Sequence, residues 1–165
     1  MVALNQGQQD AADAIELWYN LGLEDKQIYT LAGYAGTGKT FLINYIINER
    51  LKLNQDDVAY IAPTGKAASV LIQRGATNAC TLHKLIYNRV EKEYINEING
   101  KKIISKKIEF IKKPSIRKYK LIILDEVSMV DSKNMEDLIS YGIPILCCGD
   151  VAQLPPCRKT KWITW

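Results

Sequence analysis

The stretch of sequence that decides the fold is Gly33-Tyr34-Ala35-Gly36-Thr37-Gly38-Lys39-Thr40. It fits the pattern G-x-x-x-x-G-K-[ST] in full, and it stands between a short run with β-branched and aromatic members, 27–32, and a helical pattern over 41–51. In this setting the glycines let backbone N–H groups wrap around phosphates, and the start of the helix adds positive potential. The stretch predicts a phosphate-binding loop between a strand and a helix, although a chance glycine turn is the structural alternative.

The loop predicts particular contacts to a nucleotide. The Lys39 ammonium would reach the β- and γ-phosphates, and the Thr40 hydroxyl would coordinate Mg²⁺. ATP and Mg²⁺ are the cofactors we expect. The loop residues expected to bind them are Gly33, Ala35, Gly36, Thr37, Gly38, Lys39, Thr40 and Phe41.

Outward from the loop, apolar runs of strand length alternate with helical patterns. Further strands are expected at 58–62, 121–124 and 143–148, and helices at 8–21, 64–73 and 132–141, with Asn5 as a plausible cap of the first helix. Such alternation implies crossover connections. The fold class is therefore α/β, with a mostly parallel sheet flanked by helices.

A second motif stands at the end of one expected strand, Leu121-Ile122-Ile123-Leu124-Asp125-Glu126. This is the form that a Walker B element takes. Asp125 would hold Mg²⁺ opposite Thr40, and Glu126 would orient or deprotonate the attacking water. An ordinary acidic helix cap is the alternative for the pair alone. Together with the phosphate loop, the pair indicates an ATPase with Lys39, Asp125 and Glu126 as catalytic residues.

A basic segment interrupts the alternation of strands and helices. The runs 94–98 and 101–105 flank Asn99-Gly100, a strong signal for a β-hairpin. Between residues 89 and 120 there are 11 Lys or Arg and 4 Asp or Glu, a net charge of +7, whereas the whole chain carries +4. The segment suits a polyanion such as nucleic acid, or is a solubilised surface loop. We expect domain residues 1–88 and 119–157, an inserted basic hairpin at 89–118 and a tail at 158–165.

Composition narrows the class of protein. A chain of 165 residues that is 47% hydrophobic and 24% charged is typical of one globular domain. Its four cysteines, Cys80, Cys147, Cys148 and Cys157, form no C-x-x-C pair, which argues against a zinc site or a secreted disulfide framework. We expect neither a signal peptide nor a membrane anchor, because the N-terminal region is acidic and no apolar run approaches the ~20 residues of a span. The expected location is a reducing cytoplasm.

Several further stretches together resemble the RecD/Dda-like branch of superfamily 1 DNA helicases. They match that family in order and spacing and are Ala62–Ala68, Thr81–Lys84, Asp125–Asp131 and Gly149–Pro156. Residues 4–8 look like the family's Q motif, in which Gln8 corresponds to the glutamine that reads the adenine edge. The likeness covers residues 4–156, and it implies a RecA-like domain in which the strand leading to Gly149 lies between the phosphate-loop strand and the strand ending at Asp125.

The resemblance implies a role for each matching position. Motif Ia, with Pro63, Thr64 and Lys66, and motif Ib, with Thr81 and His83, would touch the backbone of single-stranded DNA. Gln153 would sense the γ-phosphate and couple it to DNA. The hairpin, with Lys101 and Lys102 beside its turn, would be the pin that splits the duplex. The alternatives are that Thr64 only caps its helix, that His83 is an ordinary surface histidine and that the hairpin is a solubilising insertion.

The function expected from the resemblance is that of an ATP-dependent DNA helicase running 5′ to 3′. Its partners would be single-stranded DNA and duplex junctions. The family continues past the Pro-Pro pair into a second RecA-like domain with arginines that reach the γ-phosphate, and residues 157–165 show no family motif. We therefore expect the front half of a motor, completed by a second RecA-like domain or a partner chain. The alternatives are an ATP-gated DNA-binding module without motor activity, and a nucleotide kinase, in which Thr64 and Lys66 have no role.

Overall fold

The centre of the computed structural model is a parallel sheet of six strands in the order β3-β2-β6-β7-β1-β8. The structure describes residues 4–22, 26–34, 36–76, 78–98, 101–150 and 162–164. The strands of this sheet are β1 (Ile28–Ala32), β2 (Val58–Ala62), β3 (Cys80–Thr81), β6 (Leu121–Leu124), β7 (Ile145–Gly149) and β8 (Trp162–Thr164). Strand β7 lies between β1 and β6, which confirms the order that the family resemblance implies.

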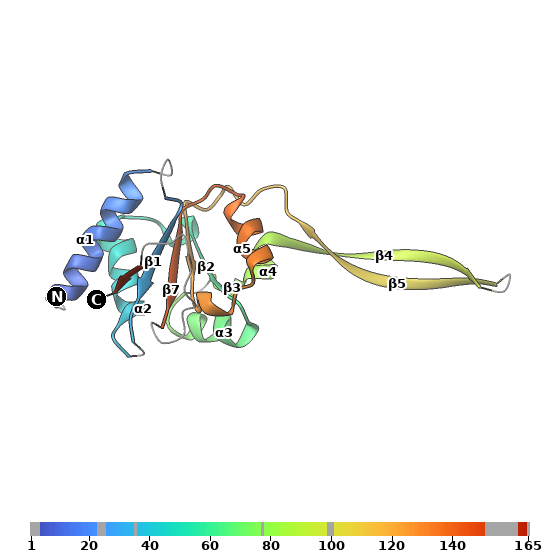
Figure 1. Cartoon of the computed structure of the whole chain (residues 1–165), viewed down its shortest axis with the longest axis horizontal. Coiled ribbons are helices and arrows are strands. Elements are labelled where there is room, and N and C mark those ends of the chain that lie inside the picture. Colours follow the sequence, from blue (N-terminus) through green and yellow to red (C-terminus); the bar gives the residue numbers. More distant parts are fainter. Residues whose placement is uncertain are drawn as a thin grey trace.

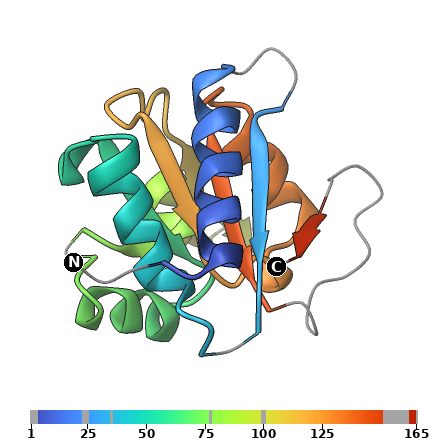
Figure 2. The ribbon, with the colours of Figure 1, turned by 90° about the vertical axis from the view of Figure 1, so that its left-hand side faces the viewer.

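Helices cover both faces of this sheet (Figures 1 and 2). One face packs against α1 (Gln6–Asn20), α2 (Lys39–Tyr45) and α3 (Gly65–Gln73), and the other packs against α4 (Leu82–Ile86) and α5 (Ser132–Ile139). Short 3₁₀ turns at Gln55–Asp57 and Val127–Met129 precede β2 and follow β6. The sheet and these helices are called the body below, and they confirm the predicted α/β class.

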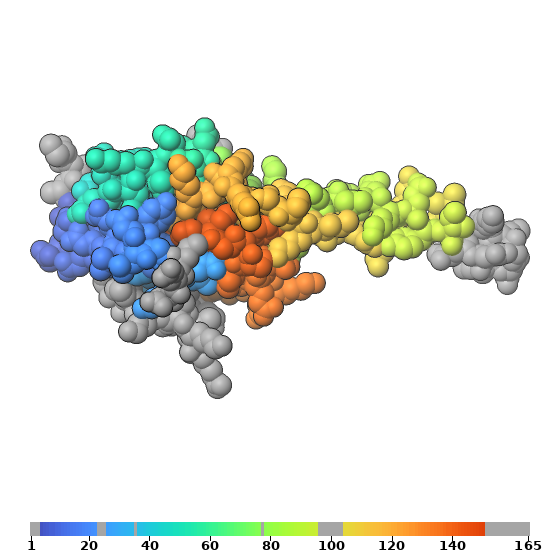
Figure 3. Space-filling view, turned by 90° about the horizontal axis from the view of Figure 1, so that it is seen from above, coloured from blue at the N-terminus to red at the C-terminus, as the bar shows by residue number. Residues whose placement is uncertain are grey.

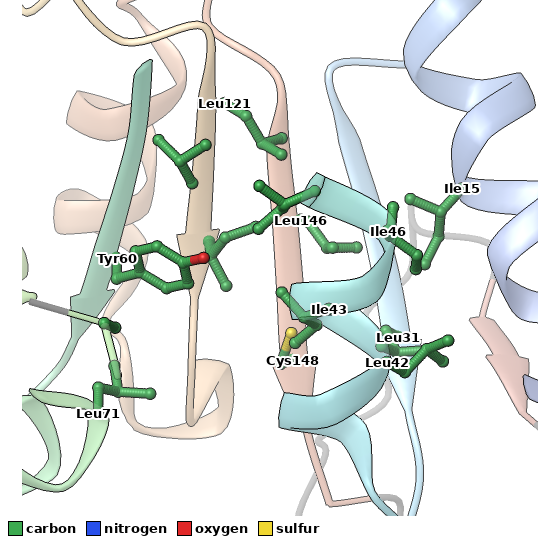
Figure 4. Close-up of a cluster of buried hydrophobic side chains, with 14 of the residues drawn as sticks. Ile15, Leu31, Leu42, Ile43, Ile46, Tyr60, Leu71, Leu121, Leu146 and Cys148 are labelled. Carbon is green, nitrogen blue, oxygen red and sulfur yellow. The ribbon is translucent and has the colours of Figure 1, made fainter. Parts of the chain in front are cut away.

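Strand β6 shows why the sequence makes a sheet buried on both faces. Leu121 and Ile123 point into the core beneath α2, whereas Ile122 and Leu124 point into the core beneath α5, and all four are at most 2% exposed. Figure 4 shows Leu121 among the buried side chains on the α2 side. Two cores require an apolar residue at every position of a central strand, so the run is continuous instead of alternating.

The neighbouring cysteines follow the same rule. Cys147 packs in the core beneath α5 and Cys148 in the core beneath α2, and both are 1% exposed. The sequence predicts this arrangement, since successive side chains of a strand point to opposite faces. Both behave as small apolar groups.

The structure differs from the sequence expectation in several elements. The helix expected over 41–51 is α-helical only as far as Tyr45 and continues as a π-helical turn over Ile46–Arg50, where the Leu51 N–H donates to the Ile46 carbonyl. Strand β3 and helix α4 are not predicted, because two and five residues are too short to show a period. Strand β8 lies in the tail, in which the sequence shows no motif.

The two strands of the hairpin are longer than the runs 94–98 and 101–105 from which the sequence predicts it. Strands β4 (Tyr87–Ile98) and β5 (Lys101–Lys112) pair antiparallel from Tyr87 with Lys112 to Ile98 with Lys101. The predicted turn at Asn99-Gly100 lies outside the described residues. Strands β4 and β5, called the arm below, stand away from the body (Figures 1 and 3).

Polar contacts fix the base of the arm to α5. The Tyr87 hydroxyl donates to the Asp137 carboxylate at 2.5 Å, and the Lys112 ammonium lies 3.5 Å from the same carboxylate. The Tyr141 hydroxyl, just beyond α5, donates to the carbonyl of Lys113 at 2.7 Å. The direction of the arm is thus set by the helix that follows Asp125 and Glu126 along the chain.

Among the described residues, no helix combines the length and the apolar character needed to cross a bilayer.

Candidate nucleotide and nucleic-acid site

The loop after β1 has the backbone geometry of a phosphate cradle. Gly36 and Gly38 have φ values of 81° and 84°, a region that side chains disfavour. A Cβ at Gly33 would lie 3.2 Å from the Thr37 hydroxyl oxygen, so a side chain there would crowd the loop. The glycines are therefore required by the turn itself.

Helix α2 begins directly after this loop. Its first intrahelical bond runs from the Leu42 N–H to the Gly38 carbonyl. The N–H groups of the preceding residues, through Phe41, have no acceptor within the helix. They form a cluster of donors at the positive end of the helix, which is the donor set that phosphate oxygens require.

Lys39 reaches back over the loop. Its ammonium donates to the carbonyls of Gly33 at 2.5 Å and Tyr34 at 2.8 Å. The lysine thus holds its charge over the space that the loop encircles. Phosphate oxygens could replace these two carbonyls as its acceptors with a small movement of the side chain.

Gln8 meets the loop from a distant part of the sequence. Its side-chain amide donates to the Thr37 carbonyl at 3.5 Å, and a Cβ at Gly38 would lie 3.2 Å from the same nitrogen. The side-chain oxygen of Gln8 accepts from the backbone N–H of Asn5, and the side-chain oxygen of Asn5 accepts from the backbone N–H of Gln8. These two bonds form a capping box that begins α1. The helix cap therefore positions the predicted adenine-reading residue beside the predicted phosphate loop.

Asp125 lies across the pocket from the start of α2. Its N–H bonds to the Ile61 carbonyl at 2.9 Å, which fixes the residue at the end of β6. Together with Lys39 and Thr40, it lines a pocket of about 60 Å³. The pocket is too small for a nucleotide and holds at most a few waters or an ion with part of its shell. Phosphates would lie over its mouth.

Glu126 has an unusual backbone conformation. Its φ of 53° and ψ of 44° put a non-glycine residue in the left-handed region, where strain is often found at functional sites. The conformation turns the chain sharply from β6 into the 3₁₀ turn, and the Glu126 side chain is exposed. Asp125 and Glu126 therefore have different surroundings, as two carboxylates with separate roles require.

The wall behind the carboxylate is apolar and uncharged. Burial raises the pKa of the Cys148 thiol well above its ordinary value, and the Asp125 charge raises it further. Burial also raises the pKa of Tyr60, on the same wall, to about 12. Both groups stay neutral at physiological pH. The charges in the pocket are thus those of Lys39, Asp125 and Arg74, and the sequence gives no signal for Arg74, at the end of α3.

These residues fit Mg²⁺ and a nucleoside triphosphate. The Thr40 hydroxyl and the Asp125 carboxylate are the hard oxygen ligands that Mg²⁺ prefers. The glycine turns and the free N–H groups at the start of α2 suit the phosphates.

The predicted DNA-contacting residues of the two body motifs lie at or just after the ends of β2 and β3. Ala62 pairs with Thr81 in the sheet, so the two motifs begin side by side. Thr64 caps α3 by accepting from the Ala67 N–H, and Thr81 caps α4 by accepting from the Lys84 N–H, both at 3.2 Å. The capping alternative for Thr64 is thus realised, and its hydroxyl can still donate to a phosphate.

The other predicted residues of these two motifs lie close by. Pro63 precedes Thr64, and Lys66 is the second residue of α3, with an exposed side chain. The exposed His83 ring packs against the base of the arm, 5.5 Å from the Tyr87 ring and 6.1 Å from the Phe110 ring.

Two predicted residues lie in the outer part of the arm, and two are not described. Strand pairing places Lys101 and Lys102 at the far end of β5, roughly 35–40 Å of strand from the body. Their side chains are outside the described part of the structure. Ala35 and Gln153 lie outside the described residues altogether.

Comparison with known proteins agrees with this geometry. The model of the AAA domain family matches residues 3–164, so the chain belongs to the AAA domain family. The ATP-dependent DNA helicase Dda of Enterobacteria phage T4 is 30% identical over 156 residues, covering 93% of this chain and 33% of its own length. The helicase PIF1 of Xenopus laevis is 29% identical, covering 86% and 22%.

A third relative has the same relationship to the chain. The RecBCD enzyme subunit RecD of Buchnera aphidicola is 31% identical over 148 residues, covering 81% of this chain and 24% of its own length. Within its family, the chain is a RecD/Dda-like superfamily 1 helicase N-terminal domain. It spans about a third or less of the length of these relatives.

Proposed function

We propose that this chain is the N-terminal motor half of an ATP-dependent DNA helicase, which hydrolyses Mg·ATP in step with single-stranded DNA binding and runs 5′ to 3′. One observation carries the proposal. The loops that follow β1 and β6 hold the nucleotide candidates, the loops that follow β2 and β3 hold the strand candidates, and all four open on the carboxyl edge of one parallel sheet. Ligands of open α/β sheets bind at this edge.

In the proposed reaction each nucleotide residue has one task. Lys39 neutralises oxygens of the β- and γ-phosphates, and Thr40 with Asp125 holds the metal. Mg²⁺, when bound, offsets charge on the phosphates. Glu126 orients the attacking water and accepts its proton. Gln153 senses whether the γ-phosphate is present.

The DNA strand would lie across the ends of β2 and β3. Pro63, Thr64 and Lys66 would contact one part of its backbone, and Thr81 with His83 the next part. Such contacts follow the phosphates and sugars without reading sequence. The arm, with Lys101 and Lys102 near its tip, would separate the duplex ahead of this groove. In this division residues 89–118 are a pin inserted into an ATP-binding domain formed by 1–88 and 119–157.

The proposed motor cycle also needs an arginine finger. Arginine fingers contribute roughly 10³ to 10⁵ in rate to related phosphoryl transfers, and we expect this arginine to come from a second RecA-like domain or a partner chain. Single-stranded DNA and duplex junctions are the proposed substrates. Free thiols at Cys80 and Cys148 fit a reducing compartment such as the cytoplasm.

The proposal is tested by binding and turnover together. We expect the purified chain to bind Mg·ATP and an oligo(dT) strand, to hydrolyse ATP slowly and to separate no duplex. Failure to bind either ligand would contradict the proposal. Strand separation by the chain alone would contradict the need for a second domain. Nucleotide-dependent DNA binding without any hydrolysis would favour the alternative of an ATP-gated binding module.

A further inference from the structure

A second, larger pocket lies at the outer edge of β3, away from the nucleotide site. Its volume is about 730 Å³. Its walls are the end of α3, the strand residues around Cys80, helix α4 and residues 113–119, the segment that returns from the arm to β6. The sequence assigns residues 113–118 only to the basic hairpin as a whole and gives them no separate role.

The pocket is lined by four basic side chains. They are Lys84, Lys113, Arg117 and Lys118. Among the described residues, none of the four has a carboxylate within the 4 Å of an ion pair. Tyr119 raises the pKa of Lys118 most. The Asp56 carboxylate, which lies beyond ion-pair distance, raises it by less. Exposed Lys84, Arg117 and Lys118 leave the pocket open to solvent.

Three lysines of this pocket lie near the Cys80 thiol. Burial raises the pKa of the half-buried Cys80 thiol, whereas the charges of Lys84, Lys113 and Lys118 all act on it in the opposite direction. The Lys113 ammonium also donates a hydrogen bond to the backbone carbonyl of Lys84 at 2.7 Å. Three of the four basic side chains of the pocket therefore lie close enough to Cys80 to lower the pKa of its thiol.

Five cations of the arm and its flank each have a carboxylate within 4 Å, whereas Lys107 of β5 has none among the described residues. The pairs are Glu91 beside Arg89, Glu109 beside Lys92, Glu93 beside Lys106, Asp137 beside Lys112 and Asp57 beside Lys120. The excess positive charge of the basic segment therefore lies at the base of the arm, in this pocket, more than along the described strands.

We propose that this pocket binds backbone phosphates of the single strand after it passes Thr81. The inference rests on the proposed function and extends its DNA path around the β3 edge toward residues 113–118. Thr81 accepts from the Lys84 N–H, so the pocket begins one helical turn from the strand candidates at the end of β3. An open pocket with several cations that have no carboxylate partner among the described residues suits successive phosphates of a flexible DNA strand better than one small anion.

Salt dependence of oligo(dT) affinity tests the proposal. Each phosphate neutralised on a single strand contributes roughly −0.7 to the slope of log affinity against log salt, so the double variant Arg117→Ala, Lys118→Ala should flatten the slope by about 1.4 if each makes one contact. The matched control is Lys106→Ala, Lys107→Ala, which removes the same charge from the arm. Equal slope changes in the two double variants would overturn the proposal.

A second readout reports on the pocket itself. Cys80 is half-buried, whereas Cys147 and Cys148 are buried, so alkylation followed by peptide mass spectrometry can follow Cys80 separately. Bound oligo(dT) should slow alkylation of Cys80, and unchanged labelling would count against the proposal. Equal protection by millimolar inorganic phosphate would overturn it in favour of a small-anion site.

The outcomes separate this inference from the proposed function. Absence of oligo(dT) binding by the unmodified chain would overturn both. Binding that weakens with Lys66→Ala but not with the Arg117 and Lys118 variant would leave the proposed function in place and overturn the pocket alone.

Discussion

Strand β6 in the body and strand β5 in the arm both contain isoleucines, but these isoleucines have very different surroundings. Ile123 of β6 is 2% exposed between helices and neighbouring strands, whereas Ile104 of β5 is 62% exposed. The body fixes its site residues through buried strands whose ends share one edge. The arm is fixed at its base by a few polar contacts and projects into solvent beyond them (Figure 3). We infer that chemistry belongs to the body and that the arm works by its position.

The largest expected effect comes from removing one core side chain from the body. Ile123→Ala leaves a cavity in a close-packed core and should lower the free energy of unfolding by about 2–5 kcal/mol. Ile104→Ala in the arm should change it by less than about 1 kcal/mol. Urea denaturation of both variants measures the difference. Similar losses in the two would mean that the arm packs against something in solution.

A smaller but more specific effect is expected at the phosphate loop. Lys39→Ala removes a charged donor and should weaken Mg·ATP binding by roughly 10- to 100-fold, with little change in the free energy of unfolding. Lys26→Ala, an exposed lysine before β1, is the control. Calorimetric titration decides the matter, and an unchanged ATP affinity of the Lys39 variant would rule out the nucleotide site.

The base of the arm should respond more weakly. Burial, with the Asp137 charge, raises the pKa of Tyr87 to about 12, so its hydroxyl remains a donor at neutral pH. Tyr87→Phe should cost about 1 kcal/mol of stability and speed amide exchange at the start of β4. Tyr94→Phe is the matched control, because its hydroxyl bonds to Glu109 within the exposed part of the arm. Equal effects would show that the base contacts do not hold the arm.

The smallest effect is expected from removing one contact to the DNA strand. Lys66→Ala should flatten the salt dependence of oligo(dT) binding by about 0.7 if it meets one phosphate. Lys133→Ala, exposed on α5 on the opposite face of the sheet, should leave the slope unchanged. Anisotropy titrations across a salt series measure both. Indistinguishable slopes would remove Lys66 from the strand path.

How far the sequence predicts this structure depends on how local each signal is. The run 121–124 and the caps at Asn5 and Thr64 are correct, because strand burial and helix capping are set by residues close together in the chain. The glycine turn between a strand and a helix is also found where the sequence predicts it, for the same reason. The sequence misses α4, since five residues carry no period, and it shortens the arm, since paired polar strands lack a hydrophobic alternation.

Properties that depend on tertiary contacts are beyond the sequence. The left-handed conformation of Glu126, a residue that ordinarily avoids it, has no local signal. Arg74 reaches the nucleotide pocket only because α3 ends beside α2. The basic pocket likewise forms where residues 113–119 return past α4, and charge counting over 89–120 assigns that charge to the hairpin as a whole.

The central claim is that nucleotide and strand bind to the body and not to the outer arm. Replacing residues 94–105 by Asn-Gly removes the outer arm and leaves its paired base intact. Calorimetric titration of this shortened chain with Mg·ATP and then with oligo(dT) tests the claim directly. We expect both affinities to equal those of the unmodified chain, and loss of either would show that the outer arm takes part in binding.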